Sequence, residues 1–262
     1  MNIYQTQHKK LRFIKTLHYV KIKYTKEAKG DYVWFVDSDD WLEDNCLKDI
    51  LDTLTGNPDV LSFSGMIPEG NRNGNAHFYG KDVDSLEKLF LHGMPDPVQF
   101  YIYSRVFLLD NNLLFKEGIK HEDTLFTPIA LYYVSKIAFY RLPVYHLLYR
   151  EGSITTTKDI KRARDLSETI KELYDFSVKI KNDKIFYGFR NKLAHRITEM
   201  LNYGIDNGPA GEMLIKQIMS NNSHYWKIMR EALDMKPRLI YWAVRLSPLS
   251  FISTYRLLTK LK

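Results

Sequence analysis

Cysteine is nearly absent from this sequence, and long apolar runs are absent altogether. Cys46 is the only cysteine in the 262 residues, which excludes an intrachain disulfide framework and an all-cysteine zinc cluster. No segment reaches the roughly 20 consecutive apolar residues of a membrane-spanning helix. The first residues also lack the apolar core and cleavage site of a signal peptide. These absences favour a cytoplasmic protein, one that can still lie against the inner face of the cell membrane.

The formal charge of +7 is unevenly distributed along the chain. Residues 1–30 hold eight cations against one acid, residues 224–262 hold eight cations against two acids, and the segment between them is net acidic. This asymmetry argues against a uniform nucleic-acid-binding surface, and no nucleic-acid-binding module is recognisable. It favours adhesion of a basic terminus to an anionic partner such as a membrane leaflet.

The composition and the spacing of apolar residues predict an α/β fold. A hydrophobic fraction of 45%, with 14% aromatic residues, is enough for a sizeable core. Residues 32–36 and 59–63 read as strands, and the apolar spacing between them predicts a helix over 42–54 with Asp40 as its N-cap candidate. Ligands of such sheets lie at the carboxyl ends of the strands.

The remaining sequence has two parts that differ in their predicted secondary structure. Gly and Asn residues predict an irregular loop over 65–80. We expect strands over 98–103, 137–140 and 144–149, and helices over 84–91, 122–134, 161–180 and 184–203, with a break at 207–209. Near residue 155 the predicted elements change from a mixture of strands and helices to helices alone, which predicts a boundary between an α/β body and a helical appendage.

Three carboxylates, those of Asp37, Asp39 and Asp40, follow the first predicted strand within four positions. Such neighbours repel one another unless water or a cation screens them. A solvated helix cap is the ordinary interpretation of an acidic turn. An EF-hand calcium loop is excluded, because Trp41 and Leu42 occupy the places where it needs Asp or Asn and then Gly. The remaining interpretation is Mg²⁺ or Mn²⁺ held by one or two carboxylates, water and a substrate diphosphate.

A second acidic pair, Glu122 and Asp123, opens a predicted helix. The pair could supply a general base that takes a proton from an attacking hydroxyl, or it could only cap the helix. Arg150 and His121 could counter phosphate charge or could lie on the surface. Ser153 could equally cap the helix that follows it. The residues alone leave these alternatives open.

Taken together, these segments resemble the family 2 glycosyltransferases of bacterial polysaccharide and cell-surface glycan synthesis. The likeness rests on AKGDYVWFVDSDDWLEDNCLKDIL, EGIKHEDTLF and YREGSIT, three signatures in the family's order over about residues 26–155. It implies a GT-A, Rossmann-like mixed sheet with a C-terminal helical appendage. It also implies inverting transfer of a sugar from a nucleotide-diphosphate sugar to a hydroxyl of a glycan or lipid-linked acceptor, with Mg²⁺ or Mn²⁺ as cofactor.

The resemblance further implies roles for residues of the two acidic motifs. Asp123 matches the family's catalytic base, and Glu122 lies beside it. Asp37 and Asp39 match the D-x-D motif. Asp39 is therefore the expected metal ligand, and Asp37 is expected to contact the nucleotide or the metal.

Other roles are implied for residues around these motifs. Arg150 and Ser153 match a loop that is expected to close over the diphosphate of the donor. Three residues are expected on the acceptor side of the site, namely Asp40, Trp41 and His121.

The chain departs from the family at its front. Family members begin with a nucleotide-binding segment that reads like VSVIIPVYN and VDDGSTD, and no counterpart occurs here. Only 36 residues precede Asp37. We therefore expect an atypical basic leader over 1–25, a partial, N-terminally truncated GT-A domain with exposed sheet edges over 26–155, and a helical region over 156–262. The alternative function is a catalytically inactive remnant that acts at most as a binding or membrane-associated protein.

The tail from Pro237 onward mixes Leu, Ile, Trp and Tyr with cations. This composition suits a helix that lies in a membrane interface, close to a lipid-linked acceptor. An amphipathic helix packed on the body, with Arg and Lys directed outward, is the alternative. Pocket shape and loops determine the donor sugar, its nucleotide and the acceptor.

Overall fold

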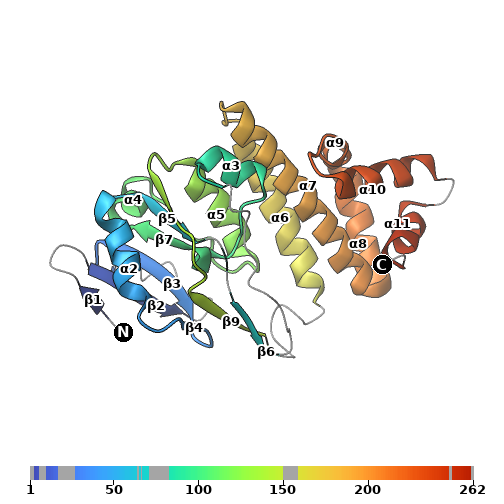
Figure 1. Cartoon of the computed structure of the whole chain (residues 1–262). Coiled ribbons are helices and arrows are strands. Elements are labelled where there is room, and N and C mark those ends of the chain that lie inside the picture. Colours follow the sequence, from blue (N-terminus) through green and yellow to red (C-terminus); the bar gives the residue numbers. More distant parts are fainter. Residues whose placement is uncertain are drawn as a thin grey trace. The chain divides into compact units, whose positions relative to one another are not determined.

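In the computed structural model, the chain divides into an α/β unit and a helical unit (Figure 1). The structure describes residues 3–5, 10–16, 27–63, 65, 67–70, 83–149, 159–247 and 250–260. The α/β unit comprises Met1–Gly118 and Glu122–Thr156, and the helical unit comprises Ile119–His121 and Thr157–Lys262. The tripeptide Ile119–His121 thus belongs to the helical unit, although in the sequence it lies between the two segments of the α/β unit.

Among the residues that the structure describes, a six-stranded mixed sheet forms the centre of the α/β unit. Its strands lie in the order β1 (Ile3–Gln5), β2 (Lys10–Thr16), β3 (Tyr32–Asp37), β7 (Tyr101–Ser104), β5 (Val60–Phe63) and β8 (Ile137–Tyr140). β2, β3, β5 and β8 run in one direction, and β1 and β7 run in the other. The predicted mixed α/β sheet is confirmed.

β7 lies between the two strands of the strand–helix–strand unit that the sequence predicts over residues 32–63. Tyr103 of β7 lies opposite Val33 of β3 on one side and opposite Val60 of β5 on the other. β3 and β5 are therefore parallel but not adjacent. The period of apolar residues identifies strands, but it does not say which strands pair, so the sequence could not reveal this insertion.

β3 has a neighbour along each side. β2 runs parallel to it, from Leu11 opposite Tyr32 to Thr16 opposite Asp37. The expectation that the short front of the chain leaves this edge of the sheet exposed is therefore wrong. Its physical reason is that a ladder needs only backbone groups in an extended segment, and the segment KLRFIKT supplies them without the family's usual sequence.

Aromatic side chains fill the core around β3. Trp34 is fully buried and stacks on Phe63 of β5, with ring centroids 4.8 Å apart. Its indole N–H donates to the carbonyl oxygen of Gln99 at 2.9 Å, so the buried donor is satisfied. Phe35 packs edge-on against Phe115 with centroids 5.2 Å apart. Because successive strand residues face opposite sides of a sheet, Trp34 and Phe35 pack on opposite faces of β3.

A second sheet and short helices complete the α/β unit. The second sheet has the order β4 (Trp41–Leu42), β9 (Tyr145–Tyr149) and β6 (Ile67–Gly70). The helices are α2 (Cys46–Thr53), η1 (Leu54–Gly56), α3 (Leu86–Leu91), η2 (Val98–Phe100), α4 (Arg105–Asp110) and α5 (Glu122–Tyr132). β6 occupies part of the expected loop over 65–80, of which residues 66 and 71–80 lie outside the described part of the chain.

α2 begins four residues later than predicted. Trp41 and Leu42 form β4 and pair with β9, so the helix starts only at Cys46. Asn45, with φ of 61°, precedes the helix, and the prediction of Asp40 as its N-cap is wrong. The apolar side chain at position 42 fits a strand as well as a helix, and the long-range pairing with β9 decides between them.

The helical unit is built on two long helices that lie side by side, α6 and α7 (Figure 1). Its helices are α6 (Ile160–Ser177), α7 (Asp183–Asp206), α8 (Gly208–Asn221), α9 (His224–Arg230), α10 (Met235–Leu246) and α11 (Phe251–Lys260). The two predicted long helices and the break after them are confirmed. Within the described residues, none of these helices has the length and apolarity to cross a bilayer.

α7 and α8 cross without room for a side chain. A Cβ atom added at Gly211 would lie 2.1 Å from the carbonyl oxygen of Gly204, and one added at Gly204 would lie 2.2 Å from a methyl group of Ile215. Glycine is therefore required at both positions, because backbone atoms of one helix contact the other directly.

Candidate functional site

β3 carries the acidic cluster to the end of the central sheet. Asp37 is the last residue of β3, and the backbone N–H of Asp40 donates to the Asp37 carbonyl oxygen at 3.3 Å, which closes a turn. Asp39 is exposed, Asp37 is half-buried and Asp40 is buried. The turn therefore directs the three carboxylates into different environments, and Asp39 is the one most accessible to a hydrated cation.

Asp40 fastens this turn to β9. Its Oδ2 accepts a hydrogen bond from the Tyr145 hydroxyl at 2.6 Å, and its Oδ1 accepts one from the Leu148 backbone N–H at 2.9 Å. The Tyr145 oxygen also accepts from the Asp37 backbone N–H at 3.0 Å. Burial raises the pKa of the Asp40 carboxyl, and the two hydrogen bonds to it oppose that rise. The expected acceptor-side role of Asp40 stays a prediction.

Gln99 orients the carboxylate of Asp37. Its side-chain N–H donates to Asp37 Oδ2 at 2.6 Å. Gln99 is only 5% exposed, and its backbone carbonyl is held by the Trp34 indole. Sequence reasoning missed this residue, although a polar side chain within the apolar run 98–103 was a signal for it, since buried amides are kept where they bond.

Asp123 reaches the same segment. Its Oδ2 accepts from the backbone N–H of Val98 at 3.4 Å. Two consecutive residues, Val98 and Gln99, thus hold the two carboxylates of Asp123 and Asp37. The structure therefore brings together the D-x-D turn and the second acidic motif through η2, within the α/β unit.

The first turn of α5 is fixed by Asp96. Its Oδ2 accepts from the Thr124 hydroxyl at 3.1 Å, and its carbonyl oxygen accepts from the Thr127 hydroxyl at 2.6 Å. In this first turn Glu122 is 3% exposed, whereas Asp123 is half-buried. A general base must reach its substrate, so the geometry favours Asp123 over Glu122.

Trp41 forms an exposed aromatic face beside the D-x-D turn. It is 43% exposed and stacks on His146 of β9, with centroids 5.2 Å apart and planes 12° apart. The His146 ring nitrogen Nε2 lies 2.6 Å from a carboxylate oxygen of Glu43. The orientation of Trp41 is therefore set by partners that sequence reasoning did not identify.

The other predicted residues are placed differently or lie outside the described part. His121 belongs to the helical unit, where its ring lies against Tyr203 with centroids 5.5 Å apart. Arg150 and Ser153 lie outside the described residues. The roles expected of these three residues therefore stay predictions.

The carboxylates of Asp37 and Asp39 fit a divalent cation only if water or a substrate supplies further ligands. Within the part of the chain that the structure describes, no cluster of three or more His, Cys, Asp or Glu side chains could hold a metal ion by itself. Asp39 and Asp37 offer carboxylate oxygens, the ligand type that Mg²⁺ and Mn²⁺ prefer. They suit a site that water and a substrate diphosphate complete.

Comparisons with known proteins point to the same part of the chain. The model of the family described as Glycosyl transferase family 2 matches residues 22–112, which include the D-x-D turn and Gln99. No curated protein matches the sequence.

Solved structures of S. aureus TarS share the fold. TarS 1-349 in complex with UDP-GlcNAc is 19% identical, with a TM-score of 0.63 over 90% of this chain and 68% of that one. The complex of TarS 1-349 with UDP is 18% identical, with a TM-score of 0.61 over the same shares. A further TarS structure has 19% identity and a TM-score of 0.51, over 88% of this chain and 40% of that one. The likeness establishes a GT-A fold.

Proposed function

We propose that this chain, whose residues 22–112 match the model of glycosyl transferase family 2, transfers a sugar from a nucleotide-diphosphate sugar to an acceptor hydroxyl with inversion at the anomeric carbon. The observation that carries the proposal is the pair of contacts from Val98 to Asp123 and from Gln99 to Asp37. These contacts hold two carboxylates on one short segment, so one can serve the donor diphosphate and the other the acceptor hydroxyl.

On the donor side, Asp39 and Asp37 would hold Mg²⁺ or Mn²⁺ together with the diphosphate. Asp39 is accessible to solvent, and Gln99 keeps the Asp37 carboxylate in one orientation. When bound, the cation would neutralise the charge that develops on the departing phosphate oxygen. Arg150 and Ser153 are proposed to contact the same diphosphate, as the family resemblance implies.

On the acceptor side, Asp123 would take the proton of the acceptor hydroxyl as the oxygen attacks the anomeric carbon. The new bond forms on the face opposite the bond to the diphosphate, which breaks in the same step, and the configuration inverts. The Val98 N–H orients the Asp123 carboxylate for this transfer.

The acceptor is proposed to be a glycan or a lipid-linked sugar. The exposed ring of Trp41 offers a flat apolar face to the carbon-bound hydrogens of a sugar ring, and the stack on His146 orients it. Asp40, in the same unit as Trp41, is proposed to complete this acceptor side. Because Asp40 is buried, it acts by holding the turn that carries Trp41.

The proposal is tested by incubating the purified protein with a panel of UDP-sugars, Mn²⁺, and glycan and lipid-linked acceptors. UDP is the first nucleotide to try, because TarS was solved with UDP and with UDP-GlcNAc. We expect release of the nucleotide that depends on the acceptor, a product with inverted configuration by NMR, and no turnover with a chelator. Donor binding without transfer would support the inactive remnant instead, and a folded protein that binds no donor would overturn the proposal.

We further propose that α10 rests on an anionic lipid bilayer. Its exposed apolar side chains recur every three or four residues and are between 47% and 76% exposed, namely Met235, Leu239, Trp242 and Leu246. Arg238 and Arg245 on the same helix are exposed too. An apolar stripe with neighbouring cations is typical of helices in the membrane interface, where anionic headgroups attract the charges.

The double variant Trp242→Gln, Leu246→Gln is expected to bind vesicles that contain anionic lipid at least about tenfold more weakly, because it removes two apolar side chains from the stripe. Flotation with anionic and zwitterionic vesicles measures the binding. Met213→Gln is the matched control, because Met213 is 72% exposed on α8. Equal binding by the double variant and the control, or a dimer in solution that the double variant abolishes, would contradict lipid as the partner.

A further inference from the structure

The tripeptide Ile119–His121 belongs to the helical unit but directly precedes the acidic pair of the α/β unit. α5 begins at Glu122, and Asp123 is its second residue. The tripeptide is therefore the segment of chain that leads directly into α5 and Asp123.

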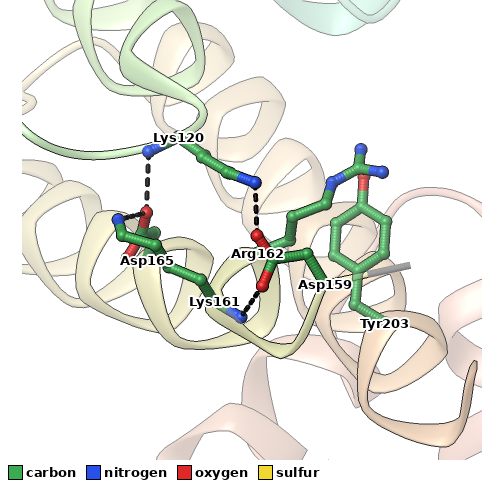
Figure 2. A network of polar contacts seen from close by, with 6 residues as sticks. All are labelled: Lys120, Asp159, Lys161, Arg162, Asp165 and Tyr203. Atoms are coloured by element: carbon green, nitrogen blue, oxygen red, sulfur yellow. Dashed lines mark hydrogen bonds and ion pairs between the residues drawn. The ribbon is translucent and has the colours of Figure 1, made fainter. Parts of the chain in front are cut away.

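Lys120 is fastened to α6 and its N-cap at two points (Figure 2). Its backbone N–H donates to Asp165 Oδ2 at 2.7 Å, and its side-chain ammonium pairs with Asp159. Lys161 joins the same two carboxylates, because its ammonium pairs with Asp165 and its backbone N–H donates to Asp159 at 2.8 Å. Figure 2 shows that these contacts close a ring around Lys120, Asp159, Lys161 and Asp165.

Asp165 is the buried member of this ring. It is 5% exposed, and a carboxylate at that depth is costly unless charges and hydrogen bonds compensate it. One of its oxygens is directed at the main chain of Lys120 rather than only at a side chain. A buried charge that bonds a backbone N–H holds a segment of chain, because rotation of the Lys120 side chain cannot release that contact.

His121 adopts a backbone conformation that needs such a constraint. Its φ of 70° lies in the left-handed region, which is unfavourable for residues other than glycine. Its ring lies against Tyr203. The Arg162 guanidinium also lies against this tyrosine, 4.0 Å from the ring centre (Figure 2 shows Arg162 and Tyr203). The helical unit therefore holds the residue on each side of the peptide bond between Lys120 and His121.

We infer that Asp165 is a positioning residue for the proposed base: by holding the Lys120 N–H it sets the turn at His121 and the start of α5, where Asp123 lies. The effect on catalysis rests on the proposed function, whereas the effect on the backbone does not.

Hydrogen exchange tests the backbone effect. In Asp165→Ala, the amides of residues 119–127 are expected to exchange at least about tenfold faster, because the charged partner of the Lys120 N–H is lost. Asp165→Asn keeps an oxygen for this N–H and should restore most of the protection. Asn191→Ala is the control, since Asn191 is also 5% exposed and accepts a hydrogen bond from the Asp234 backbone N–H at 3.0 Å in the same unit. Unchanged exchange in Asp165→Ala would overturn the inference.

Kinetics test the effect on the base. Asp165→Ala is expected to lower kcat for sugar transfer about tenfold while the KM for the donor is kept, and Asp165→Asn should recover most of kcat. An equal loss of kcat in Asn191→Ala would show a general loss of stability and overturn the inference. Faster exchange in Asp165→Ala, in a protein whose wild type transfers no sugar, would support the anchoring and overturn only the proposed function.

Discussion

Replacing Asp123 by asparagine is expected to lower kcat for sugar transfer by about 10²–10⁴-fold, the usual contribution of a general base. An amide cannot accept the proton of the acceptor hydroxyl. It can still offer an oxygen to the Val98 N–H, so the start of α5 and the fold should be kept. Binding of the donor should not change, because Asp123 is proposed to act on the acceptor.

Single-turnover rates and donor titrations on the same preparations separate these effects. Glu122→Gln is the matched control, because it makes the same chemical change one residue away at a buried side chain. We expect this control to lose less activity than Asp123→Asn. Asp123 is not the base if its asparagine variant keeps more than about a tenth of the wild-type kcat, or if Glu122→Gln loses as much.

Replacing Asp39 by alanine is expected to weaken donor binding in the presence of Mn²⁺ by at least about 10–100-fold, since even residues that only support metal ligands contribute this much. Asp39 is the exposed carboxylate of the D-x-D turn, so its loss removes a candidate ligand at the solvent-accessible side of this turn. Removing the metal from the wild type with a chelator should have the same effect. Titration calorimetry with UDP and with UDP-sugars measures both.

Asp44→Ala is the control for Asp39→Ala. It removes an exposed carboxylate and changes the net charge equally, and it lies five positions after Asp39, outside the D-x-D motif. Donor binding by this control should equal that of the wild type. An equal loss in both variants would indicate general electrostatics rather than a ligand, and wild-type binding that is indifferent to Mn²⁺ would contradict the metal site.

The elements of this fold could be predicted from local patterns, but their pairing could not. Residues 32–36, 59–63 and 137–140 have the composition of strands, and all three form them. The position of β7 between β3 and β5 and the parallel pairing of β2 with β3 depend on contacts between distant segments. Periodicity carries no information on such contacts, and the predicted helix start at 42 was wrong for the same reason.

The candidate site shows the same division. The D-x-D turn and the acidic start of α5 were recognisable as short motifs. The residues that hold them were not, because Gln99 lies 62 positions from Asp37 and Tyr145 lies 105 positions from Asp40. A lone Gln or Tyr in an apolar run resembles any other polar residue at the edge of a core until its partner is known.

The α/β unit ends at Thr156, so recombination between related genes could join a different helical region to the chain at this position. A descendant that kept the first 156 residues and acquired another helical region would inherit Asp123 but not Asp165, the partner of the Lys120 backbone. The residues proposed for catalysis would be transmitted without the contact proposed to place them. Selection should therefore favour inheritance of both units as one piece, although each is compact by itself.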